Sequence, residues 1–270
     1  MNSRAFVLLF SAAVLSAEHN QLSPSDKAAG WILLFDGKTL KGWVDPSKKT
    51  PPGDSWTIDG DAIKAKASPR ITEDLFTTQT FGDFELQFSW KIAPGANSGV
   101  KYLIQDTVWL EKKTQDAAGK FEIAVGQVMA KPQHRKNLPP GEKAQDYVVG
   151  FEYQMIDDSR HKDAQRGGKY QAGALYDMIP ASKPAAKTPG EWNEGRIVVR
   201  GDRIEHWLNG VKVVDGTLND PRVRESVEKR WEPAPKLKDM LLKRPRKQCP
   251  ISLQNHGNDA WFRDIKIRKL

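Results

Sequence analysis

Residues 83–92 read Asp-Phe-Glu-Leu-Gln-Phe-Ser-Trp-Lys-Ile, and apolar and polar side chains alternate along the stretch. A period of two is typical of a β-strand that buries one face against a core. The turn-forming residues 94–99 follow at once, and a second apolar segment occupies residues 100–104. The stretch therefore predicts two half-buried strands joined by a tight turn, and the first strand has an apolar face formed by Phe84, Leu86, Phe88 and Trp90.

Short strand signals bounded by turn residues recur along the rest of the chain. Asp59-Gly60 and Asn209-Gly210 are dipeptides typical of two-residue hairpin turns. Many short strands with frequent turns indicate an all-β sandwich or jelly roll. Further strands are expected at residues 31–35, 56–65, 121–129, 148–156, 173–176, 196–200, 203–208, 211–214, 251–254 and 261–267.

One helix is expected to interrupt the strands. Asp220 is a suitable N-cap, Pro221 suits a first turn, and apolar residues recur every four positions up to Trp231. This helix packs either on the outside of the sandwich or over the mouth of a cleft. The Pro- and Lys-rich residues 232–249 are expected to form an extended loop.

The chain has 270 residues, 39% of them hydrophobic and 28% charged, with nine Trp. This composition excludes a disordered chain, and the length suits one sandwich domain. An apolar run at residues 5–15 follows Arg4 and precedes small residues, which predicts a secretory signal peptide over residues 1–17; the alternative is a buried N-terminal strand. The run is too short to span a bilayer, so we expect no stable membrane insertion. Residues 18–270 would then form a single domain, exported to the periplasm or the extracellular space.

The formal net charge is +8, and Lys and Arg concentrate at residues 131–143 and 236–247. Neither run interleaves aromatic residues at the spacing of a base-stacking surface, so nucleic acid is not expected as a partner. The single Cys249 excludes an internal disulfide, and the apolar run that follows predicts a buried, inert thiol. No Gly-x-Ser-x-Gly, Gly-x-Gly-x-x-Gly or Gly-Lys-Ser loop is present, which argues against a serine hydrolase and against nucleotide or nicotinamide chemistry.

Four segments carry polar side chains suited to chemistry. Glu152 and Gln154 share one face of a predicted strand, which is either the floor of a polar cleft or an exposed outer sheet face. His206 lies on another strand as a general base or a structural imidazole. Gln254 and His256 point the same way at a strand end, and residues 97–102 carry Lys101 at the start of a strand.

A loop dense in carboxylate and imidazole follows residue 156. Asp157, Asp158 and His161 are candidate ligands for a divalent metal ion, although the spacing matches no strict metal motif and such loops are often simply solvated. We expect no other cofactor.

The ordered motifs identify a family resemblance from Gly30 to Leu270. The chain resembles the 3-keto-disaccharide hydrolase domain family, which implies a concanavalin A-like β-sandwich of two antiparallel sheets with a concave cleft, here with a short helical insertion. The chain departs from the family at Asn255, where members have an acid, at Asp264, where members have Asn, and in longer segments at 105–147 and 232–249. The motifs that carry the resemblance lie at residues 30–43, 97–102, 150–158, 172–177, 190–193, 206–210, 253–257 and 261–263.

The resemblance implies an enzyme that cleaves glycosides whose sugar carries a ketone at C3. Such a ketone acidifies the C2 hydrogen, so a base can start an elimination that expels the C1 substituent, and water then adds back. His206 or His256 is the expected base, Lys101 the enolate stabiliser, and Glu152 the acid or a sugar ligand. The alternatives are a non-catalytic, lectin-like carbohydrate-binding module and an ordinary glycoside hydrolase. The expected hydroxyl ligands of the carbohydrate substrate are Asn97, Gln154, Tyr176 and Gln254.

Overall fold

The computed structural model describes residues 18–45, 55–67, 73–133, 139 and 142–270. The expected signal peptide at residues 1–17 lies outside the described residues, as does part of the basic run at 131–143. Within the described part of the chain, no helix is both long and apolar enough to cross a membrane.

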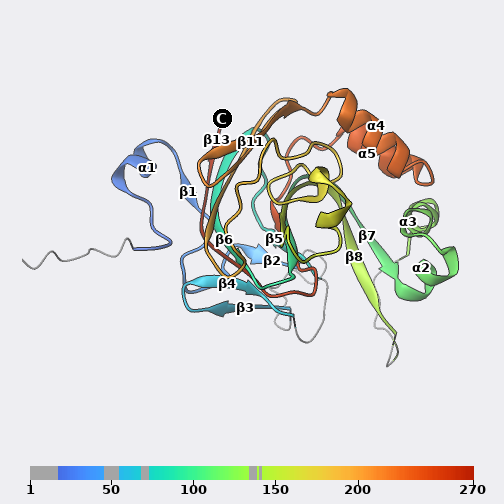
Figure 1. Ribbon diagram of the computed structural model, residues 1–270, viewed down its shortest axis with the longest axis horizontal. Helices are drawn as coiled ribbons and strands as arrows, with labels where there is room; N and C mark the ends of the chain where they lie inside the picture. Colours follow the sequence, from blue (N-terminus) through green and yellow to red (C-terminus); the bar gives the residue numbers. More distant parts are fainter. Residues whose placement is uncertain (1–17, 46–54, 68–72, 134–138, 140–141) are drawn as a thin grey trace, which may run out of the picture.

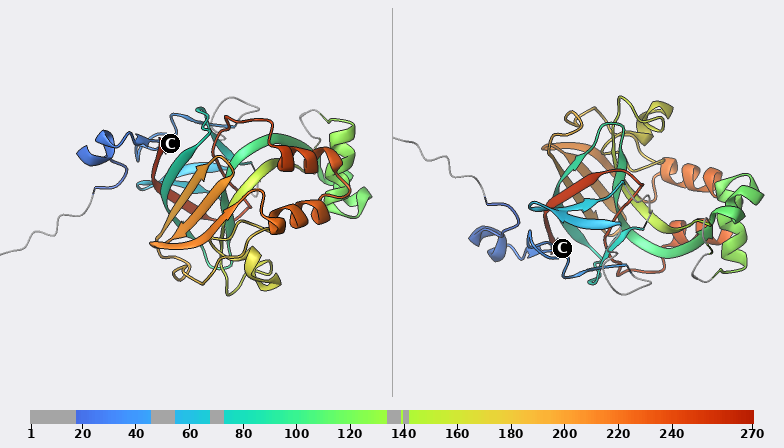
Figure 2. Two further views of the ribbon diagram at one scale, coloured as in Figure 1. Left: turned by 90° about the horizontal axis from the view of Figure 1, so that it is seen from above. Right: turned by 90° about the horizontal axis from the view of Figure 1, so that it is seen from below.

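Two antiparallel sheets pack face to face, which confirms the predicted sandwich (Figures 1 and 2). The larger sheet runs in the order β11-β10-β9-β6-β13-β4-β3, with β1 beside β13. Its strands are β1 (Ile32–Leu33), β3 (Trp56–Asp59), β4 (Ala62–Ala65), β6 (Phe84–Ile92), β9 (Asn193–Arg200), β10 (Arg203–Leu208), β11 (Val211–Thr217) and β13 (Ala260–Lys269).

The smaller sheet runs in the order β2-β5-β12-β7-β8. The long strands β7 and β8 pair along most of their length and form one edge of this sheet. A bulge between Tyr102 and Asp106 interrupts their register, and Leu103 there has a φ of 50°. The strands are β2 (Trp43–Val44), β5 (Leu75–Thr77), β7 (Asn97–Glu111), β8 (Ala144–Ile156) and β12 (Ser252–Leu253).

The core fills the space between the sheets with large aromatic side chains, as the alternation in β6 predicts. Phe88 packs over Gly195 on the neighbouring strand β9, where a Cβ atom would lie 2.5 Å from the ring. Only glycine permits this close approach. Other fully buried rings include Trp43, Trp56, Trp90, Phe84, Tyr153 and Phe262.

The predicted helix is present as α4 (Pro221–Arg230), and Asp220 caps it by accepting a hydrogen bond from the Arg222 backbone. Two further helices, α1 (Pro24–Ala28) and α2 (Lys112–Ala118), were not expected from the sequence. Two short 3₁₀ turns, η1 (Ala164–Arg166) and η2 (Gly168–Tyr170), follow β8.

Three sequence predictions of local structure were wrong. Residues 121–129 form a helix, α3 (Phe121–Ala130), because their buried residues fall at helical rather than alternate spacing. Residues 232–249 contain α5 (Pro235–Lys243), which buries Leu237 and Leu241 one turn apart. Residues 173–176 form turns, with only isolated bridges at Leu175.

Helices α3, α4 and α5 pack together at one end of β7 and β8, and we call this group the helical cap (Figure 2). Helix α3 packs closely against the segment between α4 and α5 at Gly126, where a Cβ atom would lie 2.1 Å from the Pro233 carbonyl oxygen. The cap overhangs the face of the smaller sheet that points away from the larger sheet.

Candidate functional site

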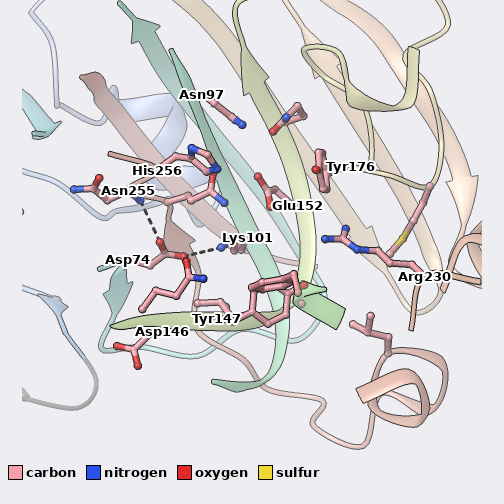
Figure 3. Close-up of a pocket in the computed structure, with 18 of the residues that line it drawn as sticks. Asp74, Asn97, Lys101, Asp146, Tyr147, Glu152, Tyr176, Arg230, Asn255 and His256 are labelled. Carbon is pink, nitrogen blue, oxygen red and sulfur yellow. Dashed lines mark hydrogen bonds and ion pairs between the residues drawn. The ribbon is translucent and has the colours of Figure 1, made fainter. Parts of the chain in front are cut away.

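A cavity of about 350 Å³ lies between this face of the smaller sheet and the helical cap (Figure 3). Strand parity creates its floor. Phe151 and Tyr153 of β8 point into the core, so Glu152 and Gln154 point the other way into the pocket. The pocket is lined by Asp74, Asn97, Lys101, Phe121, Gln145, Asp146, Tyr147, Val148, Gly150, Glu152, Gln154, Tyr176, Met178, Arg230, Trp231, Leu241, Gln254, Asn255 and His256.

Lys101 and Asp74 form a buried ion pair in this pocket. Lys101 Nζ donates to Asp74 Oδ2 over 2.9 Å, and the two residues are only 6% and 5% exposed. Burial alone would lower the pKa of Lys101, but the charges of Asp74 and Glu152 outweigh it and raise that pKa. The ammonium group therefore stays charged and fixed in position.

Asp74 was not predicted from the sequence, because no motif surrounds it. It comes just before β5 and accepts hydrogen bonds from three groups: Lys101, the Ser252 hydroxyl at 3.2 Å and the Asn255 backbone N–H at 3.1 Å. Its two oxygen atoms are thus engaged by β7, β12 and the turn after β12. Asp74 orients Lys101 rather than facing the cavity as a free base.

Glu152 is a pocket carboxyl group with a strongly shifted pKa. Burial and the nearby Asp74 charge raise its pKa to about 7, although Lys101 and Arg230 act in the opposite direction. Gly99 on the neighbouring strand makes room for this carboxylate, since a Cβ there would lie 2.4 Å from Glu152 Oε1. Glu152 can therefore hold or release a proton near neutral pH.

Gln254 links this carboxyl group to the ammonium group. In the orientation that satisfies both ends of its amide, Gln254 donates to Glu152 Oε1 over 3.3 Å and accepts from Lys101 Nζ over 3.2 Å. Gln154, in the equivalent orientation, donates to the same Glu152 oxygen over 3.2 Å. Side chains from three predicted segments therefore meet in the pocket: Lys101 from β7, Glu152 and Gln154 from β8, and Gln254 from the end of β12.

His256 lies half-buried at the same end of the pocket (Figure 3). Burial, Lys101 and His161 together lower its pKa, so the imidazole is neutral at neutral pH. The His161 ring lies edge-on at a centroid distance of 6.2 Å. A neutral imidazole retains the lone pair that a general base needs.

Asn97 and Tyr176 also line the pocket, as predicted for hydroxyl ligands. Asn97 is 4% exposed, and its Oδ1 atom has no hydrogen-bond partner among the residues that the structure describes. Arg230, at the end of α4, was not predicted; it approaches the Tyr176 ring at 5.7 Å and pairs with Glu122 at 3.2 Å and Asp177 at 3.3 Å. Of the two positions considered for the predicted helix, the contact of Arg230 and Trp231 with the pocket favours the cleft mouth.

A family model described as a 3-keto-alpha-glucoside-1,2-lyase-like domain matches residues 30–268. The chain belongs to this family. A relative from Bacteroides thetaiotaomicron, named 3-keto-disaccharide hydrolase, is 30% identical over 97% of this chain and 86% of its own length. The resemblance identified from the sequence motifs is thereby confirmed.

Two solved structures from Parabacteroides distasonis, both carrying the provisional name glycosyl hydrolase, share the fold. The first has a TM-score of 0.69 at 22% identity and covers 94% of this chain and 100% of its own. The second has a TM-score of 0.56 at 24% identity and covers 89% and 99%. At these identities the likeness supports the sandwich fold of the 3-keto-alpha-glucoside-1,2-lyase-like domain.

Asn255, the position where the resemblance implies an acid, lies in a turn of the backbone. Asn255 Nδ2 donates to the Ser55 carbonyl over 2.9 Å, and its Oδ1 accepts from the Gly257 N–H over 2.8 Å. Both ends of the Asn255 side-chain amide therefore stabilise the turn that precedes and positions His256.

His206 does not lie with the other candidates, which corrects the expectation that it faces the cleft. The residue is 0% exposed in the core, where its Nδ1 donates to the Gly173 carbonyl over 3.0 Å and its Nε2 lies 2.8 Å from the Tyr102 hydroxyl. Burial lowers the pKa of His206 to about 4, although hydrogen bonds to the Gly173 and Ala174 backbone act to raise it. His206 therefore has a structural role in the core, where it satisfies the Gly173 carbonyl and the Tyr102 hydroxyl.

The structure also corrects the metal-site expectation. Both Asp157 oxygens are engaged by backbone N–H groups: Oδ1 accepts from Ser159 and Arg160 in its own loop, and Oδ2 accepts from Gly95 in the turn between β6 and β7. Asp158 accepts from the Ala172 N–H over 2.8 Å. His161 faces His256 rather than these carboxylates, and among the described residues no group of three His, Cys, Asp or Glu side chains is arranged to hold a metal ion.

Cys249 is buried, as predicted. Burial raises the pKa of its thiol to about 11, with Arg246 and Lys247 opposing the shift only partly. A thiol in this state is a poor nucleophile at neutral pH.

Proposed function

We propose that this protein is a carbohydrate-active enzyme that cleaves glycosides whose sugar carries a ketone at C3. Family membership and the Bacteroides relative named 3-keto-disaccharide hydrolase support an enzyme acting on sugars. The chemistry proposed is removal of the C2 proton, loss of the C1 substituent and addition of water.

The observation that carries this proposal is the placement of a fixed ammonium group beside a carboxyl group that can hold or release a proton near neutral pH. Lys101 is locked by Asp74, and Glu152, with a pKa of about 7, lies beside it. A cation placed in a cavity stabilises an oxyanion that forms during reaction. Shifted pKa values of this kind gather at catalytic sites and favour an enzyme over a binding module.

In the proposed first step, the neutral His256 imidazole takes the C2 proton. The electron pair of the C2–H bond forms a C2–C3 double bond, and the C3 oxygen becomes an enolate that Lys101 stabilises. The enolate then reforms the ketone and expels the C1 substituent, whose oxygen receives the Glu152 proton. This leaves a C1–C2 double bond conjugated with the C3 ketone.

Hydration completes the net hydrolysis. Water adds its oxygen to C1, the water proton passes to Glu152, and C2 takes back a proton from protonated His256. The products are the 3-keto sugar and the free alcohol, so every atom of one water molecule is accounted for. Asn97, Gln154, Tyr176 and Gln254 remain the proposed hydroxyl ligands, and the unpartnered Asn97 Oδ1 suits a sugar O–H donor.

An ordinary glycoside hydrolase usually needs two carboxyl groups that act on opposite sides of the anomeric carbon. Here Asp74 is the carboxylate whose charge acts on Glu152, and it already accepts hydrogen bonds from three donors. This arrangement favours elimination over direct displacement.

The test is incubation of the purified protein with a 3-keto glucoside and with its unoxidised parent. The proposal expects release of the alcohol from the keto form alone. Turnover of the parent at a similar rate would identify an ordinary glycoside hydrolase, and binding of either sugar without turnover would identify a carbohydrate-binding module.

A further inference from the structure

The pocket has two chemically different ends. The polar end is formed by Asp74, Asn97, Lys101, Glu152, Gln154, Gln254 and His256. The other, which we call the aromatic end, is formed by Phe121, Tyr147, Val148, Met178, Trp231 and Leu241. Glu152 and Val148 lie on the same face of β8, and at about 3.3 Å per residue they are separated by roughly 13 Å along the strand. This length accommodates a sugar ring and one further ring side by side.

The aromatic end is a packed cluster of rings with an open face. The Phe121 and Tyr147 rings meet edge to face at 5.1 Å, and Trp231 backs both, at 6.4 Å and 5.5 Å. Trp231 is almost fully buried, whereas Phe121, Tyr147 and Met178 are only half-buried. The open face of this cluster therefore turns its apolar surface toward the cavity.

Apolar surface inside a pocket is suited to an apolar ligand group. Phe121, Val148, Met178 and Leu241 offer no strong hydrogen-bond donor or acceptor in their side chains, so the hydroxyls of a second sugar would lose their water partners there. An aromatic ring would instead bury its surface and meet Phe121 and Tyr147 in the favoured edge or offset geometry. Gln145 and Asp146 line the pocket beside Tyr147 and supply its polar rim.

Arg230 lies beside Tyr176, across the pocket from Asp74 and His256 (Figure 3). Its guanidinium lies 4.9 Å from the Trp231 ring and interacts electrostatically with Glu152. Its ion pairs with Glu122 and Asp177 hold it in place. A fixed cation there would stabilise the negative charge that an aryl oxygen carries as it leaves.

We propose that the aromatic end is an aglycone subsite, and that the preferred substrates are 3-keto glucosides with an aromatic group at C1. This inference rests on the proposed function and names the substrate class of the same site. The helical cap supplies Phe121, Trp231 and Leu241 to this subsite, and β8 and the loop after it supply Tyr147, Val148 and Met178.

The test compares kcat/KM for phenyl 3-keto-glucoside, methyl 3-keto-glucoside and a 3-keto disaccharide of two glucose units. We expect the phenyl compound to exceed the disaccharide by about tenfold or more. Because phenol is also a better leaving group, the variants decide the matter: Phe121→Ala should lower the phenyl-to-disaccharide ratio at least about fivefold. A wild-type preference for the disaccharide, or an equal loss on both substrates in Phe121→Ala, overturns the inference.

Matched variants guard against a folding defect. Met178→Gln keeps the side-chain length but adds an amide, and it should also lower the ratio. Trp192→Ala removes a half-buried ring that packs against Lys91 and Arg263 outside this pocket, and it should leave the ratio unchanged.

Binding measurements separate failure of this inference from failure of the proposed function. If no 3-keto glycoside is turned over, the proposed function fails. Calorimetry with unoxidised phenyl and methyl glucoside then tests the subsite alone. Tighter binding of the phenyl compound that Phe121→Ala abolishes supports the subsite, and equal affinities overturn it.

Discussion

Replacing Asp74 by Asn should destabilise the protein strongly while changing its shape very little. The substitution keeps the side-chain volume but leaves the buried Lys101 ammonium without its closest anion. Removing one partner of a buried ion pair costs about 3–5 kcal/mol. Glu152 remains beside Lys101 and attracts it, so we expect a loss near the lower limit, about 3 kcal/mol.

For a domain of this size, 1 kcal/mol corresponds to roughly 2–4 °C in Tm, so Asp74→Asn should lower Tm by about 6–12 °C. Scanning calorimetry at pH 7 measures this directly. The double variant Asp74→Asn/Lys101→Met removes both charges and should recover most of the lost stability, because the buried ammonium group that Asp74→Asn leaves without its anion is no longer present.

The exposed pair of Asp239 and Lys243 on α5 provides the control. Asp239→Asn should leave Tm within about 1 °C of the wild type. The reasoning is refuted if Asp74→Asn melts within about 2 °C of the wild type, or if the double variant is no more stable than the single one.

Three further predictions concern other parts of the molecule. Glu152→Gln should lower kcat by about 10²–10⁴-fold and remove the fall in the wild-type rate as pH rises through about 7. The folded state raises the pKa of Glu152 from 4.5 to about 7, so the folded protein binds this proton more tightly than the unfolded chain. The free energy of unfolding of the wild type, measured by urea titration relative to this variant, should therefore decline by on the order of 3 kcal/mol between pH 4.5 and 7. His206→Phe leaves the Tyr102 hydroxyl and the Gly173 carbonyl without a buried partner, so it should cost about 2–5 kcal/mol yet retain turnover below its Tm; a loss of turnover in a folded variant would restore His206 as a catalytic candidate. Asp157→Ala should cost about 1–3 kcal/mol through its lost loop hydrogen bonds, measured by thermal melting, and an unchanged Tm would contradict that structural role.

The alternation of apolar residues made the sandwich predictable, and the same parity placed much of the site. Glu152 and Gln154 alternate with the buried Phe151 and Tyr153, so their common face could be inferred. The parity argument also contained the correct placement of His206, because Ile204 and Leu208 share its face of β10 and both are buried.

Other features depended on contacts that the sequence does not show. Asp74 and Arg230 enter the pocket from separate segments, and each becomes recognisable only through a partner distant in sequence, Lys101 or Glu122. The helix α3 had a readable signal in the spacing of Ala124, Val125, Val128 and Met129. Its β-branched residues favoured a strand prediction, and burial of that helical face against its neighbours decided otherwise.

The most direct test of the proposed mechanism is cleavage of a 3-keto glucoside in D₂O, followed by mass or NMR analysis of C2 in the released sugar. In the proposed steps the C2 hydrogen passes to the half-buried His256, whose N–H exchanges with solvent before C2 is reprotonated. The product should therefore carry deuterium at C2 well above that of free 3-keto sugar incubated without enzyme. The His256→Ala variant should lose both this incorporation and turnover. Full turnover with protium retained at C2, together with an unchanged rate for substrate deuterated at C2, would show that the glycosidic bond breaks without removal of the C2 proton and would contradict the account.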